Sequence, residues 1–257
     1  MQNRLREAVA RRGRAVGTFL SVATPSYVES ISSSGLDYVV IDTEHGSYDT
    51  MRIGDMVRAA DSVGLCPVVR VSDATHKEIQ HAVDEGAEGI IVPCLRRVED
   101  FRRVVELGKF APVGNRGFAK ARGCRFGNET WAQGPLDEYM RACNEKVLLL
   151  PQCETAEALE HIEEIAAIDG IDGIFVGPFD LSICLGIPAR FDDPRFTAAI
   201  ERVLRACRAA GKLSLIFTAS VEDARRYLAM GFDAVANGLD TTLLAQHYRA
   251  MVDEIRK

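Results

Sequence analysis

Two acidic side chains of this 257-residue chain each follow a short apolar run that is typical of a buried β-strand. Glu154 comes after the run 147–150, and Asp180 comes after the run 173–176. Side chains just past the carboxyl ends of parallel strands point into the crevice where ligands bind. Two carboxylates with few other hard ligands nearby suit a divalent cation that keeps coordination positions for water and substrate. The pair therefore predicts a metal site.

Further polar side chains stand at the ends of other predicted strands, and together they suit chemistry on a 2-oxo acid. They are Asp42, Glu44, His45, Arg70, Gln152, Thr218 and Asn237. A divalent ion that chelates the acid would stabilise the enolate formed when a carbon–carbon bond breaks. His45 can carry a proton, Arg70 can neutralise negative charge on the oxygen, and Gln152 can orient the acid. No lysine stands at a predicted strand end, which argues against a Schiff-base aldolase.

The same residues have plainer interpretations. Glu154 could favour the start of the following helix through the helix dipole, and Asp180 could be a helix N-cap. Arg70 could be an ion-pair partner of Asp42 or Asp73. Two caps at adjacent strand ends would be a coincidence, so we favour the metal interpretation for the two acids.

These side chains need a scaffold that brings many strand ends together. Apolar runs that predict strands fall at 16–20, 38–41, 67–71, 89–92, 147–150, 173–176, 213–217 and 234–236. Amphipathic segments that predict helices alternate with them, the last over 241–256. Eight such units in about 250 residues predict a single α/β domain over residues 1–257, a (β/α)8 TIM barrel. An open doubly wound sheet is the alternative, but no GxGxxG motif follows the first strand.

The segment 110–134 interrupts this alternation and is rich in glycine. A loop of this length inside a compact domain is more often functional than idle. It carries Arg116, Arg122 and Arg125, which either form a solvated face or bind a carboxylate of the substrate.

Composition narrows the class of protein. The formal net charge is −6 and the sequence pI is about 5.5, which argues against nucleic acid or a membrane surface as a partner. No apolar run approaches the ~20 residues of a transmembrane helix, and residues 1–14 lack the apolar core of a secretory signal. Seven scattered cysteines without a CxxC pair predict unpaired thiols in a reducing cytoplasm. Cys153 has no base beside it, so we expect a buried thiol.

Six short motifs resemble those of one enzyme family. They are DTEHG at 42–46, VRV at 69–71, VDEGA at 83–87, GNRG at 114–117, QCET at 152–155 and GPFDLS at 177–182. In this order they resemble the HpcH/HpaI aldolase/citrate lyase family, the metal-dependent (class II) pyruvate aldolases. The resemblance spans residues 17–244 and implies a barrel of the phosphoenolpyruvate/pyruvate type.

The resemblance also implies roles for individual residues. Glu154 and Asp180 match the ligands of a divalent metal, namely magnesium, manganese or cobalt. His45 matches the general base, and Arg70 matches the residue that stabilises the enolate. The positions that match pyruvate contacts, or belong to the same motif, are Gln152, Gly177, Pro178 and Phe179.

Two features of the sequence fit the family pattern less directly. Asp84 matches a carboxylate that raises the basicity of the histidine, but it ends a predicted helix, at the opposite end of the barrel from His45. Asp42 is the nearer candidate partner of His45 on geometry. Phe179 stands where a small residue is common, and the loop after Gly117 is about two residues shorter than in the family's dioate aldolases. A bulky ring at Phe179 would narrow the pocket, and the resemblance implies that the loop region helps to choose the aldehyde.

The resemblance implies a homohexamer, a trimer of dimers that exchange their last helix, here 241–256. The first functional hypothesis is a cytoplasmic lyase that cleaves a 4-hydroxy-2-oxo acid reversibly to pyruvate and an aldehyde. The second keeps the site but decarboxylates an oxaloacetate-type acid or cleaves a citryl- or malyl-type ester. The third is a barrel that binds 2-oxo acids without turnover. We disfavour the third because a retired site would have lost some of these residues.

Overall fold

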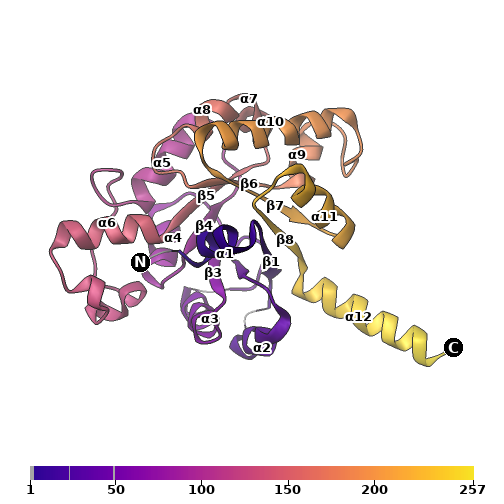
Figure 1. Cartoon of the computed structure of the whole chain (residues 1–257), viewed down its shortest axis with the longest axis horizontal. Helices are drawn as coiled ribbons and strands as arrows, with labels where there is room; N and C mark the ends of the chain where they lie inside the picture. Colours follow the sequence, from indigo (N-terminus) through magenta and orange to yellow (C-terminus); the bar gives the residue numbers. More distant parts are fainter. Residues whose placement is uncertain (1–2, 23, 49) are drawn as a thin grey trace.

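Short apolar runs form parallel strands that pair in sequence order and close into a barrel (Figure 1). The computed structural model describes residues 3–22, 24–48 and 50–257. The strands are β1 (Ala15–Leu20), β2 (Tyr38–Asp42), β3 (Cys66–Arg70), β4 (Gly89–Val92), β5 (Leu148–Cys153), β6 (Gly173–Val176), β7 (Leu213–Thr218) and β8 (Ala234–Leu239). Because β8 pairs with β1 and helices alternate with the strands, the predicted (β/α)8 barrel is confirmed.

Helices connect successive strands on the outside of the barrel. They are α1 (Arg4–Arg12), α2 (Pro25–Ser30), α3 (Thr50–Ser62), α4 (His76–Asp84), α5 (Val98–Gly108), α6 (Leu136–Lys146), α7 (Ala156–Glu160), α8 (Ile162–Ala166), α9 (Pro178–Cys184), α10 (Pro194–Ala210), α11 (Val221–Met230) and α12 (Asp240–Ile255). Local chemistry sets several boundaries. The Thr75 hydroxyl accepts from the amide of Glu78 at the start of α4, and Gly211 ends α10 in the left-handed conformation.

The boundaries differ from the sequence-based expectation at several elements, and three of the differences concern β5, β6 and the helices that follow them. The helix expected over 156–167 breaks at His161 into α7 and α8, and a short helix that we did not expect, α9, follows β6. Strand β5 continues past residue 150, because Gln152 and Cys153 pair with Phe175 and Val176 of β6. The sequence signal stopped earlier because polar residues interrupt the apolar run, although both sides of the strand end are buried.

The barrel has an apolar interior and a second apolar layer beneath the helices. The interior is filled by inward-facing strand residues, among them Phe19, Tyr38, Phe175 and Leu215. Helix α1 lies across one end of the barrel in Figure 1 and contributes Leu5 to the same cluster. The outer layer joins the other strand faces to helices α3, α4, α5, α8 and α10. This packing is expected of parallel strands that are buried on both faces.

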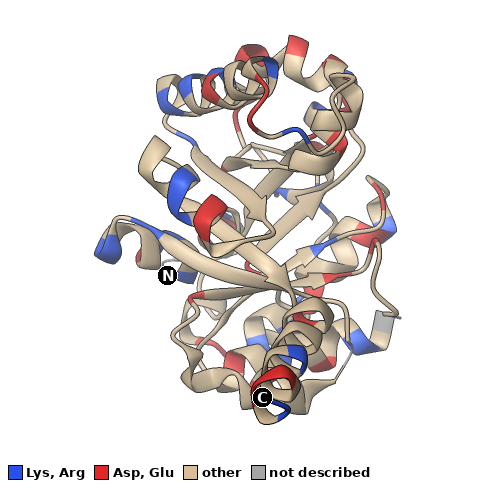
Figure 2. Cartoon of the chain, turned by 90° about the vertical axis from the view of Figure 1, so that its right-hand side faces the viewer, with Lys and Arg blue, Asp and Glu red and all other residues tan. Residues whose placement is uncertain are grey.

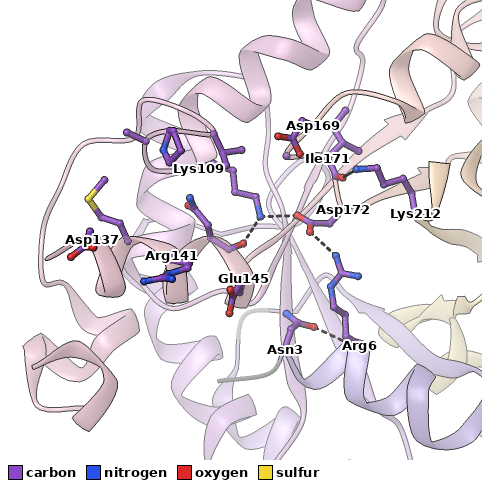
Figure 3. Close-up of a pocket in the computed structure, with 17 residues that line it drawn as sticks. Asn3, Arg6, Lys109, Asp137, Arg141, Glu145, Asp169, Ile171, Asp172 and Lys212 are labelled. Atoms are coloured by element: carbon purple, nitrogen blue, oxygen red, sulfur yellow. Dashed lines mark hydrogen bonds and ion pairs between the residues drawn. The ribbon is translucent and has the colours of Figure 1, made fainter. Parts of the chain in front are cut away.

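An ion network lies at the amino-terminal end of the strands, far along the barrel from the strand ends that carry the predicted chemistry. Figure 3 shows this region, which borders a pocket of about 1020 Å³. The Lys109 side chain is almost fully buried, and its Nζ lies 2.8 Å from Asp172 Oδ2. The same Nζ donates to the carbonyl oxygens of Asn144 and Val147, at 2.6 Å and 2.5 Å. Arg6 binds the other oxygen of Asp172 at 2.6 Å.

Helix α12 leaves the barrel and extends into solvent (Figure 1). Along residues 241–251 every side chain is exposed, including Leu244, Tyr248 and Met251. Figure 2, in which this helix points toward the viewer, shows acidic and basic residues interspersed over the surface helices. Among the residues that the structure describes, no helix is long and apolar enough to cross a membrane.

The first prediction concerns the Lys109 network. Lys109→Met keeps the aliphatic stem but leaves two buried carbonyls and one oxygen of Asp172 without their cation. Removing one partner of a buried ion pair costs about 3 kcal/mol or more. We expect a clear decrease in the urea midpoint of unfolding, measured by circular dichroism. Lys77→Ala, at an exposed position of α4, is the control and should leave the midpoint unchanged. An unchanged midpoint for Lys109→Met would show that the network contributes nothing.

Candidate active site

Two strand-end residues form the centre of the candidate site. Asp42 ends β2 and Arg70 ends β3, and the register places them directly opposite each other. Arg70 Nε and Nη2 donate to the two oxygens of Asp42 at 2.8 Å and 2.7 Å. Asp42 is fully buried, so this two-point hydrogen bond is shielded from water. The ion pair that the plainer interpretation offered for Arg70 is therefore present, and it fixes the guanidinium at the barrel mouth.

The third nitrogen of Arg70 binds a second carboxylate. Nη1 lies 2.9 Å from Glu44 Oε2, and the guanidinium carbon lies 4.9 Å from the centre of the Phe19 ring. Burial alone would lower the pKa of Arg70, but the hydrogen bonds and charges of Asp42 and Glu44 raise it above its ordinary value. The guanidinium is therefore permanently charged, and its position is fixed by Asp42, Glu44 and the Phe19 ring.

Glu154 follows β5 at the same end of the barrel and forms no ion pair with a described lysine or arginine. It is buried, and its Oε1 accepts from the backbone amide of Cys94 at 2.6 Å. Its Oε2 accepts from the side-chain amide of Gln152. Burial raises the pKa of Glu154; the Cys94 amide acts against this, and repulsion from Asp180 and Glu44 adds to it. Glu154 is therefore a crowded carboxylate that a positive charge would stabilise.

The turn after β6 brings Asp180 toward Glu154. Gly177 is the N-cap of α9, Pro178 is its first residue, and Asp180 lies in its first turn and is exposed. A Cβ on Gly177 would stand 2.5 Å from Glu154 Oε2 and 2.8 Å from Gln152 Nε2. Only glycine therefore lets this backbone approach the two side chains so closely. Asp180 is not a helix N-cap, because Gly177 holds that position.

One buried polar atom beside Glu154 has no partner. Gln152 is almost fully buried, and its Oε1 accepts no hydrogen bond from the described part of the chain. A buried unpaired amide oxygen is costly in a folded protein, so it marks polar room for a ligand or water. No group of three His, Cys, Asp or Glu residues among those described has a metal-binding arrangement, so this chain offers the two carboxylates Glu154 and Asp180.

His45 and Asp84 lie apart within one chain. The His45 side chain is 72% exposed, and its Nε2 lies 4.0 Å from Glu44 Oε1. The carboxylate of Asp42, the nearer candidate partner on geometry, binds Arg70 and reaches only the backbone amide of His45, at 3.5 Å. Asp84 ends α4 and binds Arg116 at 2.6 Å. Its position at the far end of the barrel agrees with the geometric expectation.

The arginines of the segment 110–134 bind groups of their own chain. Arg116 is buried, with its guanidinium carbon 4.6 Å from the Phe110 ring centre. Arg122 lies 2.6 Å from Asp61 and donates to the Glu85 carbonyl at 2.8 Å. Arg125 is exposed and lies 3.0 Å from Glu129. Within this chain, then, none of the three is placed among the mouth residues.

Sequence reasoning missed Cys94, which positions Glu154. Cys94 follows β4 by two residues and adopts a positive φ of 59°, which turns its amide toward Glu154. Burial, then the charges of Glu154 and Glu44, raise the pKa of its thiol to about 11, so the thiol is protonated at neutral pH. Its place after a strand was a usable signal, but a lone thiol carries no obvious chemistry. Cys153, in contrast, is the buried thiol that we predicted.

A closed parallel barrel with charged and amide side chains converging at its strand ends defines an enzyme of the TIM-barrel class. The family model for HpcH/HpaI aldolase/citrate lyase matches residues 15–247, so the chain belongs to this family and is a carbon–carbon lyase. The 4-hydroxy-2-oxo-heptane-1,7-dioate aldolase of Salmonella dublin is 34% identical to it over 253 residues, which are 98% of this chain and 94% of that enzyme.

Two solved structures show how far the likeness extends. The citrate synthase SbnG is 29% identical, with a TM-score of 0.85 over 97% of this chain and 96% of its own. A citrate lyase beta subunit from M. tuberculosis, solved with oxaloacetate and magnesium, is 18% identical. Its TM-score is 0.58, over 89% of this chain and 93% of its own. At that identity the second likeness shows the fold alone.

The second prediction tests the fixed guanidinium. Asp42→Asn removes the buried carboxylate that holds Arg70 and places an amide donor against a cation. We expect a loss of about 3 kcal/mol in the free energy of unfolding, measured by urea denaturation. Asp55→Asn, which alters an exposed pair with Arg58 on α3, should cost less than about 0.5 kcal/mol. Equal effects of the two substitutions would contradict the role given to Asp42.

Proposed function

We propose that this lyase cleaves a 4-hydroxy-2-oxo acid reversibly into pyruvate and an aldehyde, with a divalent cation held by Glu154 and Asp180. The observation that carries the proposal is the crowded, buried carboxylate of Glu154, which has two hydrogen-bond donors and forms no ion pair with a described lysine or arginine. The unpaired Gln152 oxygen lies in the same place. The likeness to a dioate aldolase at 34% identity supports the same reaction type.

The residues present fit such a cation. Both side chains offer hard oxygen ligands, which Mg²⁺ and Mn²⁺ prefer and Co²⁺ accepts. Two carboxylates leave coordination positions for water and for a chelating substrate. The mutual repulsion that raises the pKa of Glu154 would turn into attraction once a cation lay between the acids. The Cys94 amide and Gly177 hold one face of Glu154, so the carboxylate is oriented in advance.

Cleavage can be followed on the substrate atom by atom. The C4 hydroxyl gives up its proton, the bond between C3 and C4 breaks, and the aldehyde leaves. The electron pair of that bond moves into the C2–C3 bond and onto the keto oxygen, and C3 then takes a proton to give pyruvate. When bound, the cation would supply the Lewis acidity that stabilises this negative charge. Arg70 adds a fixed positive charge at the mouth. His45 is exposed there and can carry the proton in both steps.

A second candidate keeps the site and changes the outcome. An oxaloacetate-type acid would lose carbon dioxide, or a citryl- or malyl-type ester would be cleaved. The likeness to SbnG, a citrate synthase at 29% identity, favours keeping this candidate. Purified enzyme with pyruvate and a series of aldehydes separates the two. Aldehyde-dependent loss of pyruvate supports aldol chemistry, whereas carbon dioxide release from oxaloacetate without aldehyde supports the alternative.

The third prediction concerns the metal. Treatment with EDTA should abolish turnover, and Mn²⁺ or Mg²⁺ should restore it. Glu154→Gln and Asp180→Asn each remove one anionic ligand, so we expect a loss of kcat of about 100-fold or more with little change in the thermal midpoint. Mn²⁺ binding, followed by electron paramagnetic resonance, should weaken in both variants. Asp193→Asn, which removes the half-buried N-cap carboxylate of α10, is the control. Full Mn²⁺ binding by both site variants would refute the ligand assignment.

We also propose that the chain assembles as a hexamer, a trimer of dimers that exchange α12, in the cytoplasm. The support is the helix itself, which among the described residues packs mainly against β1 and β8 of its own barrel and exposes a series of large apolar side chains. Such a face is stable in water only when a partner covers it. Seven unpaired cysteines fit a reducing compartment.

The fourth prediction tests that assembly. Tyr248→Asp combined with Met251→Asp places two charges on the exposed face of α12, and sedimentation velocity should show a smaller species than the wild type. Gln246→Asp together with Asp253→Asn redistributes charge without removing apolar surface and should leave the assembly intact. A wild-type protein that sediments as a monomer would overturn the proposal directly.

A further inference from the structure

We propose that Phe179, packed on Phe217 and Phe191, forms an apolar wall that binds the aldehyde half of the substrate and selects uncharged apolar aldehydes. The inference rests on the proposed aldol function and specifies its substrate class. We call these three residues the aromatic wall.

The aromatic wall stands at the mouth of the barrel. Phe217 lies near the end of β7 and packs against the cluster that fills the barrel interior. Its ring centre lies 5.5 Å from that of Phe19, whose ring in turn lies under the Arg70 guanidinium. Phe179 continues this series outward, with its ring 6.1 Å from Phe217 and 5.1 Å from Phe191.

Phe179 keeps a large exposed face although it precedes a predicted metal ligand. Its side chain is 40% exposed, whereas Phe19 and Phe175 in the interior are buried. Phe179 is the neighbour in sequence of Asp180 and lies in the same turn as Gly177, whose Cα approaches Glu154. A substrate chelated between Glu154 and Asp180 would therefore extend its far end beside this ring. The exposed ring face is the surface that an apolar chain would cover.

Charge at the mouth argues against an acidic aldehyde. Asp42 and Glu44 both bind Arg70, and Cys94 contacts Glu44 through its thiol and Glu154 through its amide. Asp180 lies in the turn whose Gly177 approaches Glu154, so four carboxylates converge here. Among the described residues, Arg70 is the one lysine or arginine that forms ion pairs with these acids, and Asp42 and Glu44 occupy it. Because Arg70 is already occupied, a second carboxylate on the aldehyde would meet the aromatic wall without a cation from the described residues that pair with these acids.

The expected specificity differs from that of the named relative. Cleavage of 4-hydroxy-2-oxo-heptane-1,7-dioate between C3 and C4 gives pyruvate and 4-oxobutanoate, an aldehyde with a terminal carboxylate. Pentanal has the same reach and ends in a methyl group. The aromatic wall predicts that the wild-type enzyme has a kcat/KM for pentanal at least ~10-fold above that for 4-oxobutanoate, since a buried unpaired charge is strongly disfavoured.

The fifth prediction is a specificity test on the whole assembled enzyme with Mn²⁺. Phe179→Ala should lower kcat/KM for pentanal about 5- to 10-fold, the value of burying one to two methylene groups, and change that for 4-oxobutanoate much less. Phe179→Arg should reverse the preference by supplying the missing cation. Ile183→Ala, at an exposed apolar position one turn further along α9, is the matched control and should keep the wild-type ratio.

A second measurement separates the failure of this inference from failure of the proposed function. Exchange of the pyruvate methyl protons in D₂O reports enolate formation and needs no aldehyde, so in the wild-type enzyme it tests the proposed function separately from the choice of aldehyde. Exchange with a wild-type preference for 4-oxobutanoate, or with an unchanged ratio in Phe179→Ala, would overturn the aromatic wall alone. No exchange in the wild type would overturn the aldol function and the inference with it.

Discussion

The unequal balance of charge at the barrel mouth is the constraint on which the rest of the site depends. Four carboxylates converge there, and two of them, Asp42 and Glu44, share the single positive charge of Arg70, which Asp42 binds from a fully buried position. The other two, Glu154 and Asp180, have no ion-pair partner among the described residues. Repulsion between unpaired carboxylates held close together lowers the stability of the fold, and such repulsion is common at functional sites. A cation from solution would relieve it and would itself be bound more tightly for the same reason.

The backbone conformation around Glu154 is constrained as strongly as the side chains that contact it. Cys94 holds a left-handed conformation that costs free energy for a residue with a Cβ, and in return its amide fixes one oxygen of Glu154. Gly177 removes the Cβ that would collide with the other oxygen. Thr155 then caps α7 with its hydroxyl, so the chain after Glu154 turns away from the mouth. The carboxylate is therefore oriented by its neighbours before any ligand arrives.

Most of the fold could be predicted from the sequence, because parallel strands buried on both faces leave an unambiguous apolar signature. The strand ends were less accurate where Gln152 and Cys153 continue β5, since a polar residue inside a buried strand looks like the start of a loop. The metal-type acids were predicted from position alone. The role of Cys94 was not, because a backbone amide and a positive φ leave no trace in a side-chain pattern. The contacts among Phe179, Phe191 and Phe217 join three separate segments, which only the folded chain brings together.

Buried charges are paired at one end of the barrel and unpaired at the other. The paired end contributes to stability, and the unpaired end is the candidate for chemistry. At the amino-terminal end the buried charge of Lys109 has partners: burial lowers its pKa, the charge and hydrogen bond of Asp172 act against that effect, and two carbonyl oxygens accept hydrogen bonds from the same Nζ. The large pocket beside it is therefore a poor candidate for catalysis, despite its size. At the mouth, the carboxylates of Glu154 and Asp180 form no ion pair with a described residue, and Gln152 Oε1 has no hydrogen-bond partner there. A ligand gains most binding free energy where the protein leaves its own polar groups without partners. The crowded mouth, at the carboxyl ends of the strands, is therefore the end of the barrel suited to bind a ligand.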